Sequence, residues 1–281
     1  MQRDKKPKFS ICICNRNMQD TLGISIASIL VQIDERFEVV VVDDGSSDRS
    51  LSILEDFQSN YSNFKYFSLP SDKSRKLGIT RNISIEKALG DWVILHLDAD
   101  DVVGEGLIDF VEDVLKIHSV DSTPILYSGH QIHMAPREWL LSFGPYRNLY
   151  RLEDRDLYQR LIPGEQWRIL KHKPFINRLI RDRRSILRKT VHDAFDHLVS
   201  DSRYRANFLE ALGKEFSRKT GKKPLLKFYR IFLLPFAFKV GRKLGTLETS
   251  NGNFSDQGVR LYREGHAKNA DEWCQYLSSL E

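Results

Sequence analysis

Gly90–Asp101 reads Gly-Asp-Trp-Val-Ile-Leu-His-Leu-Asp-Ala-Asp-Asp, a mainly apolar run that ends in acidic residues. The run Trp92–Leu97, bounded by turn signals, predicts a buried strand. Carboxylates that follow the C-terminal end of such a strand lie where open α/β sheets bind ligands. Asp98 and Asp100 flank a single alanine, and carboxylates this close repel each other unless a cation lies between them. Taken by itself, the stretch is equally compatible with an acidic turn on a solvated loop.

The segments on both sides of this stretch alternate between strand and helix patterns. Apolar or β-branched runs at residues 9–14, 37–42, 65–69 and 92–97 predict strands, and the segments 20–32, 49–59 and 77–89 predict helices. The alternation predicts an α/β fold with a mostly parallel, doubly wound sheet. Further along, we expect a helix at 106–118, a strand at 124–128, a loop at 135–150 and a helix at 151–161. Beyond residue 166 the pattern is helical and basic, and no further strand is predicted.

Composition divides the chain into two parts. Its 281 residues are enough for one large α/β domain with an extension. Residues 1–165 carry 19 Lys and Arg against 26 Asp and Glu, whereas residues 166–281 carry 24 against 12. The three cysteines, without the spacing of a metal site, favour a reducing compartment. The N-terminal residues lack the apolar core of a signal peptide, and no apolar run reaches about 18 residues, so we expect neither a secretion signal nor a transmembrane helix.

Short motifs occur along the first part of the chain in a specific order. They are Cys14-Asn15-Arg16-Asn17, Val-Val-Asp43-Asp44-Gly-Ser-Ser-Asp48, Gly78-Ile-Thr-Arg81-Asn82, Ala88-Leu-Gly-Asp-Trp, Asp98-Ala-Asp100-Asp101 and Glu153-Asp154-Arg-Asp156-Leu-Tyr-Gln-Arg160-Leu. Each motif is weak alone, but the ordered series resembles the family 2 glycosyltransferases, which have the Rossmann-like GT-A fold. The resemblance covers about residues 8–165.

The resemblance implies a nucleotide site. Asp44 matches the acid that recognises the nucleotide base, and a carboxylate can accept the imide N–H of uracil or the N1–H of guanine. The resemblance also implies that Asp43 shapes the turn or assists, that Asn15 contacts the base, and that Arg81 lies near the nucleotide diphosphate. The alternative for Asp43 and Asp44 is a loop in which the acids only cap the following helix. The alternative for Arg81 is an arginine on the protein surface.

The same resemblance implies a metal site at the acidic turn. Asp100 matches a direct ligand of Mn²⁺ or Mg²⁺, and Asp98 matches a residue that contacts the ribose or bridges to the metal. Hard cations bind a few carboxylates and complete their shell with phosphate oxygens. Asp101 ranks lower because this position varies in the family.

Asp154 matches the catalytic base of the family, which deprotonates the acceptor hydroxyl. A single base opposite the leaving group implies in-line displacement with inversion at the sugar carbon. Glu153 would orient the loop or contact the acceptor, and His130 is a weaker candidate for the sugar or acceptor site. The alternative for Asp154 is an ordinary acidic first turn of a helix, stabilised by the helix dipole. For His96, just before the acidic turn, we favour a core position over a role in the site.

The basic second part contains two segments in which apolar residues and cations alternate, Trp167–Lys189 and Pro224–Leu244. The second segment is too charged to span a bilayer comfortably, and it fits a helix lying in the interface of an anionic membrane. The alternative is a helix packed on the catalytic domain with its cations in water. Many members of the family glycosylate lipid-linked acceptors, which such a segment would suit.

We therefore expect an inverting, metal-dependent glycosyltransferase. Its domain would span residues 1–165, followed by a basic helical region at 166–281. It would use a UDP- or GDP-sugar and a glycan or lipid-linked acceptor, in the cytoplasm at the inner face of the cell membrane, without binding nucleic acid. The rivals are a sugar-nucleotide pyrophosphorylase, whose glycine-rich loop is absent after the first strand, and a non-catalytic relative that binds membrane or nucleic acid.

Overall fold

Eight strands join in one sheet, in the order β10-β8-β6-β7-β4-β1-β2-β3. The computed structural model describes residues 6–149, 152–179, 194–205, 207–217, 224–246 and 256–280. Within the sheet β1 (Phe9–Asn15), β2 (Phe37–Asp43), β3 (Phe64–Ser68) and β4 (Trp92–Leu95) run parallel, whereas β7 (His133–Pro136) runs antiparallel to both of its neighbours. The prediction of a mostly parallel α/β sheet is confirmed.

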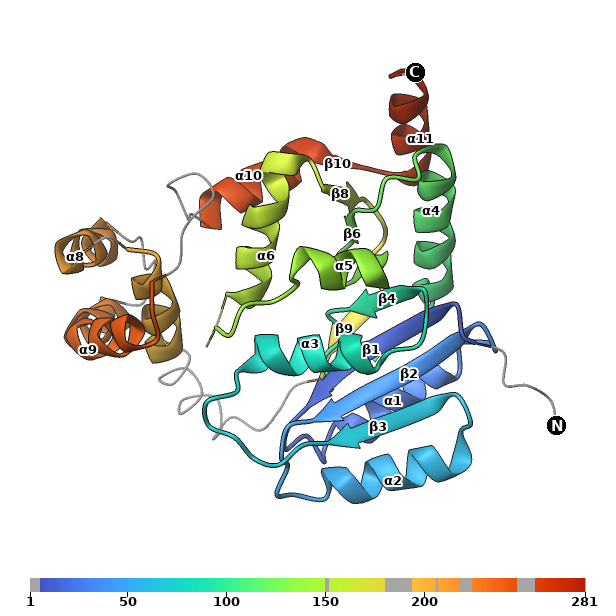
Figure 1. The fold of residues 1–281 in the computed structure, drawn as a ribbon, viewed down its shortest axis with the longest axis horizontal. Helices are drawn as coiled ribbons and strands as arrows, with labels where there is room; N and C mark the ends of the chain where they lie inside the picture. The colour runs from blue at the N-terminus through green and yellow to red at the C-terminus, as the bar shows by residue number, and fades with distance from the viewer. Residues whose placement is uncertain are drawn as a thin grey trace.

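Helices cover both faces of the parallel strands (Figure 1). Alternate residues of β1 point to opposite faces, so Ile11 and Ile13 pack with α1 (Leu22–Leu30) while Cys12 packs in the core that includes Ile85 of α3 (Leu77–Lys87). The helices α2 (Ser50–Asn60) and α4 (Leu107–Val120) join the first core, and α5 (Arg137–Phe143) and α6 (Glu153–Leu161) join the second. Double coverage explains the apolar run Val39–Val42 of β2, a strand whose residues are all buried.

The predicted ligand-binding edge forms where three neighbouring strands stop. Asn15 at the end of β1 lies opposite Asp43 at the end of β2. β4 pairs with β1 on its other side and ends at Leu95, because His96 adopts a left-handed backbone conformation with φ of 70°. The turns after these strands therefore lie side by side, and they carry the acids that the sequence singled out.

Two sequence-based predictions of secondary structure are wrong. Residues 135–150, expected to be a loop, contain the end of β7 and the whole of α5. The region beyond residue 166 was expected to contain no strand, yet it provides β8 (Trp167–Leu170), β9 (Ile176–Arg178) and β10 (Ala267–Lys268). These strands are too short to show the alternation of apolar and polar residues that marks a strand in a sequence. In β8 the pattern is also interrupted by Arg168, which is buried there because it is paired with Asp121. The helical pattern expected for residues 180–189 lies outside the described residues.

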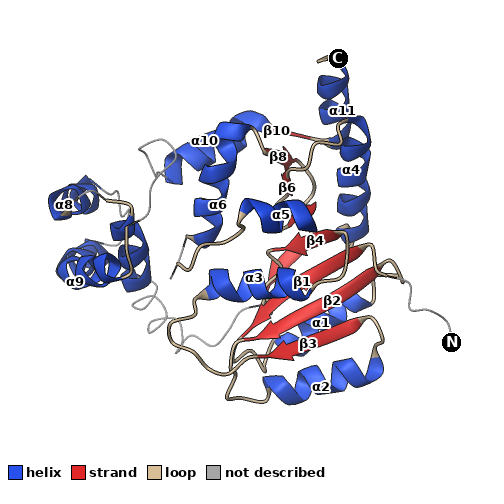
Figure 2. Ribbon diagram, in the orientation of Figure 1, coloured by secondary structure: helices blue, strands red, loops and turns tan. Residues whose placement is uncertain are grey.

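β8 and β10 extend the sheet beyond residue 165 (Figure 2). β8 pairs with β6 (Leu126–Ser128) and with β10, both in parallel. β9 pairs instead with β5 (Asp101–Val103) in a separate ribbon. After β8 the helices α10 (Asp256–His266) and α11 (Ala270–Ser278) return to the main body, where the Trp273 indole donates to the Ile169 carbonyl at 3.0 Å. The division into domains at residue 165 stays a prediction, but the main sheet contains strands from both sides of that residue.

The remaining described helices form a smaller unit with its own core. A helix over residues 194–203, α8 (Phe208–Ser217) and α9 (Pro224–Lys243) pack around buried Leu198, Val199 and Leu234. We call residues 194–205, 207–217 and 224–246 the helical lobe. No helix among the described residues has the length and apolar character needed to cross a bilayer.

Gly45, in the turn after β2, permits a test of how tightly the cavity edge is packed. Its φ is +69°, and an added Cβ would come within 2.6 Å of the Ser71 backbone. Gly144 has a similar φ of +81° but nothing within 4 Å of its added Cβ, so it serves as the matched control. We expect Gly144→Ala to lower the free energy of unfolding by about 1 to 2 kcal/mol, the cost of a left-handed alanine. Gly45→Ala should cost clearly more in urea denaturation, and equal losses would contradict the close approach of Ser71.

Candidate active site

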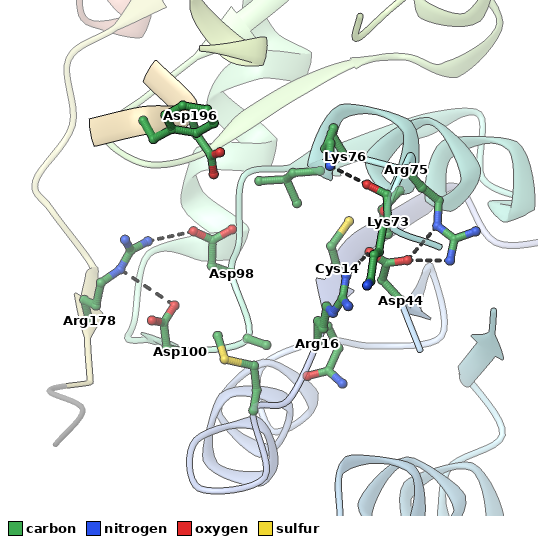
Figure 3. A pocket seen from close by; sticks show the side chains of 16 residues that line it. Cys14, Arg16, Asp44, Lys73, Arg75, Lys76, Asp98, Asp100, Arg178 and Asp196 are labelled. Carbon is green, nitrogen blue, oxygen red and sulfur yellow. Dashed lines mark hydrogen bonds and ion pairs between the residues drawn. The ribbon is translucent and has the colours of Figure 1, made fainter. Parts of the chain in front are cut away.

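A cavity of about 640 Å³ lies beside the ends of β1, β2 and β4 (Figure 3). Each strand contributes residues at or after its end: Cys14 and Asn15 end β1 and Arg16 follows it, Asp44 follows β2, and Asp98 to Asp100 follow β4. The rest of the described lining comes from four other places, namely Met18 before α1, the start of α3 with its preceding loop (Lys73, Arg75, Lys76, Leu77, Thr80), β9 (Arg178) and the helical lobe (Phe195, Asp196). The structure thus brings Asp44, Asp98 and Asp100 to one cavity.

One end of the cavity is mainly cationic. Arg75 Nε donates to Asp44 Oδ1 at 2.6 Å, and Arg16 Nη1 donates to Asp44 Oδ2 at 3.4 Å. Lys73 and Lys76 lie at the same end (Figure 3). Two guanidinium groups therefore hold the Asp44 carboxylate in place, and more positive charge surrounds it than this one carboxylate balances. Such a wall favours a phosphate-bearing ligand.

Asp43 shapes the turn rather than lining the cavity. Its side chain is fully buried and accepts hydrogen bonds from Asn15 Nδ2 at 2.6 Å and from the Ser46 N–H at 2.9 Å. Asn15 itself does line the cavity, and its buried Oδ1 has no hydrogen-bond partner among the residues that the structure describes. An unpaired buried carbonyl costs free energy, so this atom is a natural acceptor for a bound ligand. Asp43 does not bind the first N–H group of the following helix α2. That group, the Ser50 N–H, donates to the Asp48 carboxylate instead.

The other end of the cavity contains the acidic turn. Arg178, at the end of β9, donates from Nη2 to Asp98 Oδ2 at 2.8 Å and lies 3.8 Å from Asp100 Oδ1. Its Nε also donates to Asp101 Oδ1 at 3.1 Å. Asp101 is fully buried and outside the cavity lining, and burial raises its pKa although Arg178 opposes the shift. Asp98 and Asp100 are therefore the two carboxylates of this turn that a ligand in the cavity can reach.

Arg81 joins the acidic turn to the start of α6. Its buried guanidinium lies 3.2 Å from Asp98 Oδ1 through Nη2 and 3.6 Å from Glu153 Oε1 through Nε. Burial alone would lower the pKa of Arg81, but the negative groups around it, led by Asp98, raise that pKa above its ordinary value. The side chain thus keeps its charge and holds two acidic segments that are distant in the sequence.

Asp154 lies next to this bridge but outside the cavity lining. It follows Glu153 in the first turn of α6, which begins after Leu152 in a left-handed conformation with φ of 72°. Its Oδ1 accepts the Arg155 N–H at 2.8 Å. His130 also lies outside the lining: it is exposed, and its backbone N–H donates to His172.

Behind Arg81 lies a buried group of aromatic and imidazole rings. His96 and His133 are in edge contact with ring centroids 4.2 Å apart, and His133 Nε2 shares a 2.5 Å hydrogen bond with the Tyr158 hydroxyl. Burial lowers the pKa of both histidines well below the ordinary value, so both are neutral at physiological pH. His96 therefore packs within the protein interior, and it also breaks β4 ahead of the acidic turn.

Several lining residues were not predicted from the sequence. Arg178 falls in a segment whose cations follow roughly helical intervals, so no signal marked it as part of a strand facing the acids. Arg75 and its neighbouring lysines belong to a polar loop that no motif covers. Cys14 and Arg16 belong to a quoted motif without an assigned role. Burial raises the pKa of Cys14 to about 12, which excludes a thiolate nucleophile at neutral pH.

Comparison with known proteins identifies the family of this fold and site. Residues 10–164 match the family described as Glycosyl transferase family 2. The chain belongs to glycosyl transferase family 2. It is 30% identical over 158 residues to a cholesterol galactosyltransferase of Borreliella burgdorferi, covering 56% of this chain and 42% of that relative. The chain thus spans less than half the length of this family member.

Solved structures support the GT-A fold of this family 2 chain. The mannosyltransferase PcManGT of Pyrobaculum calidifontis, solved with GDP-Man and Mn²⁺, superposes with a TM-score of 0.55 at 14% identity, covering 98% of this chain and 85% of that one. Residues 1–349 of S. aureus TarS, solved with UDP-GlcNAc, superpose with a TM-score of 0.53 at 17% identity, covering 85% and 92%. At these identities the likeness concerns the fold alone.

Replacement of Arg81 tests whether it holds the site together. Arg81→Gln removes the charge between Asp98 and Glu153, and removing one partner of a buried ion pair costs up to about 3 kcal/mol, here mainly at Glu153 because Asp98 keeps its contact with Arg178. We expect the urea midpoint to fall accordingly, whereas Arg81→Lys should recover part of the loss because it restores the charge without both contacts. An unchanged free energy of unfolding in Arg81→Gln would contradict a stabilising bridge.

Proposed function

We propose that this protein transfers a sugar from a nucleotide-diphosphate sugar to an acceptor hydroxyl, with inversion at the sugar carbon. The observation that carries the proposal is one cavity lined both by Asp44, at its cationic end after β2, and by Asp98 and Asp100, at its acidic end after β4. Membership of glycosyl transferase family 2 supports the reaction class.

The cationic end of the cavity is the proposed site for the nucleotide. Asp44 would accept the imide N–H of uracil or the N1–H and amino group of guanine, so the donor is a UDP- or GDP-sugar. Arg75 orients the Asp44 carboxylate for that contact. Asn15 offers its unpaired Oδ1 to the nucleotide, and Arg81 lies where it would add positive charge near the diphosphate. Asp43 supports the contact indirectly by fixing the turn.

Asp98 and Asp100 fit a divalent cation, Mn²⁺ or Mg²⁺. Both reach the cavity, and both already surround a positive charge, that of Arg178. Among the described residues no group of three or more His, Cys, Asp or Glu side chains is arranged to hold a metal, so the remaining ligands would be diphosphate oxygens and water. When bound, the cation would neutralise the charge that develops on the leaving diphosphate. PcManGT, solved with GDP-Man and Mn²⁺, is consistent with this choice.

Asp154 is the proposed general base. The acceptor oxygen attacks the anomeric carbon, the bond from that carbon to the diphosphate oxygen breaks, and the acceptor proton passes to the Asp154 carboxylate. The nucleoside diphosphate leaves with the bonding electrons, and displacement from the opposite side inverts the carbon. Glu153, held by Arg81, fixes the start of α6 so that Asp154 faces the acceptor once the acceptor is bound. His130, exposed and outside the cavity lining, would contact the acceptor at a distance from the donor.

The acceptor is proposed to be a lipid-linked or cell-envelope glycan. The Borreliella burgdorferi relative is named for the transfer of galactose to cholesterol, a membrane lipid. The basic second part of the chain suits an anionic membrane, so we propose that the protein acts in the cytoplasm at the inner face of the cell membrane. No role for nucleic acid is proposed.

Asp154→Asn tests the base. We expect transfer to fall by about 10² to 10⁴-fold, the usual contribution of general base catalysis, while donor affinity is retained. Release of UDP or GDP from a panel of sugar nucleotides measures transfer, whereas release of pyrophosphate from a nucleoside triphosphate and a sugar 1-phosphate would favour the pyrophosphorylase. The control is Asp109→Asn, which removes the first-turn acid of α4. If both variants transfer sugar like the wild type, Asp154 only stabilises its helix.

Arg178→Gln tests the proposed cation site without relying on activity. Arg178 and a divalent cation would compete for Asp98 and Asp100, so removing the arginine should tighten Mn²⁺ binding by about tenfold. This is less than the roughly 4 kcal/mol between unit charges 4 Å apart at an effective dielectric constant of 20, because the Arg178 side chain is half exposed to water. Isothermal titration of Mn²⁺ into the protein without donor measures this. Arg16→Gln, at the other end of the cavity, should bind Mn²⁺ like the wild type, and Asp100→Asn should abolish binding. Unchanged affinity in Arg178→Gln would argue against a cation at these carboxylates.

A further inference from the structure

Three phenylalanines of α9 point into solvent from one face of the helix. Phe228, Phe232 and Phe236 are 73%, 69% and 60% exposed, although phenylalanine is normally buried. They are spaced four residues apart, which places them in a row along the helix. We call Phe228, Phe232 and Phe236 the phenylalanine row. α8 packs against α9 and adds exposed Leu209 and Phe216 to the same lobe.

The opposite face of α9 is firmly packed, which fixes the direction of the row. Leu234 and Ala237 are buried in the core of the helical lobe. Arg230 is buried too, and its Nε and Nη2 donate to the Glu215 carboxylate at 2.7 and 2.8 Å. Of the cations in Pro224–Leu244, Arg230 therefore faces the core of the helical lobe and not the solvent. The phenylalanine row is therefore the outward side of an anchored helix.

The charge of α9 indicates what covers the row. Pro224–Lys243 contains five cations and no acidic residue, and Lys239 and Lys243 are exposed beyond the end of the row. A second copy of the chain would bring these like charges together in a self-complementary contact, which is unfavourable. An anionic bilayer instead accepts both features, because aromatic rings enter the boundary between headgroups and acyl chains while lysines reach the headgroups.

The helical lobe also forms part of the cavity wall. Phe195 and Asp196, at the start of its first helix, line the cavity. The same helix contacts α9 closely at Gly241, where an added Cβ would come within 2.2 Å of Ser202 Oγ. A lobe seated on a membrane would therefore keep the lipid surface in fixed relation to the donor cavity.

We propose that α9 seats the protein on an anionic membrane, with the phenylalanine row inserted and with Lys239 and Lys243 on the phospholipid headgroups. This inference rests on the proposed function in one respect, because it names the bilayer as the source of the acceptor. The surface itself is defined by exposure and charge, and it can be tested without any acceptor.

Vesicle sedimentation of the full chain tests the proposal. We expect binding to vesicles that mix phosphatidylcholine with phosphatidylglycerol, and weak binding to phosphatidylcholine alone. Changing all three residues of the phenylalanine row to serine should reduce the partition coefficient at least about tenfold, because the variant loses three apolar rings from the inserted face. The matched control changes three exposed apolar residues outside the lobe, Ile24, Val31 and Leu89, to serine and should bind like the wild type.

Two further measurements separate the parts of the proposal. Lys239→Glu combined with Lys243→Glu should weaken binding to the mixed vesicles and reduce its dependence on salt. Phe232→Trp should shift its added fluorescence to shorter wavelength with the mixed vesicles, which reports insertion even if the serine variant is less stable. Donor hydrolysis in solution should be equal in the wild type and in the variants of α9.

Four outcomes would overturn the membrane surface. They are a wild type that stays in the supernatant with mixed vesicles, a serine variant of the row that sediments like the wild type, a wild type that binds single-stranded RNA but not vesicles, and a dimer that depends on the row. Failure of the proposed function looks different. In that case the protein sediments as expected, but no sugar nucleotide is consumed.

Discussion

A buried guanidinium group, that of Arg81, holds the proposed site together. It lies between Asp98 of the turn after β4, which is partly exposed in the cavity, and Glu153 at the start of α6, which is buried and needs a positive partner. The sheet brings the turns after β1, β2 and β4 to one edge, but α6 comes from a later part of the chain. The ion pairs of Arg81 connect that helix to the edge.

The other acids along the cavity are also paired with cations. Asp44 is held by Arg75 and Arg16 at one end, and Asp98 and Asp100 surround Arg178 at the other. Each acid therefore has a cation beside it before any ligand is bound. A nucleotide-diphosphate sugar would bring both a base, which needs an acceptor, and phosphates, which need cations. The cavity offers these groups separately, at positions set by rigid turns.

The sequence predicted the parallel half of the fold because each element there is long enough for its pattern to be clear. Phe37–Asp43 is buried on both faces and reads as one apolar run, and the acids that end the neighbouring strands follow directly. The failures occur where tertiary contacts override local pattern. β7 and β8 are four residues each, and Arg168 in β8 is tolerated because Asp121 pairs with it and the Trp273 ring lies beside its guanidinium. Arg178 lies in the site because β9 pairs with β5, and no local sequence pattern indicates that pairing.

The place of β8 in the sheet has a consequence for how the protein can be divided. β8 lies between β6 and β10, so it satisfies backbone groups along one side of β6. Trp167 of β8 is buried in a stack with Tyr158 of α6 and Tyr262 of α10. A fragment ending at residue 165 would expose both an unpaired strand edge and the ring of Tyr158. Open edges of this kind recruit other chains, so such a fragment would aggregate rather than behave as an independent catalytic unit.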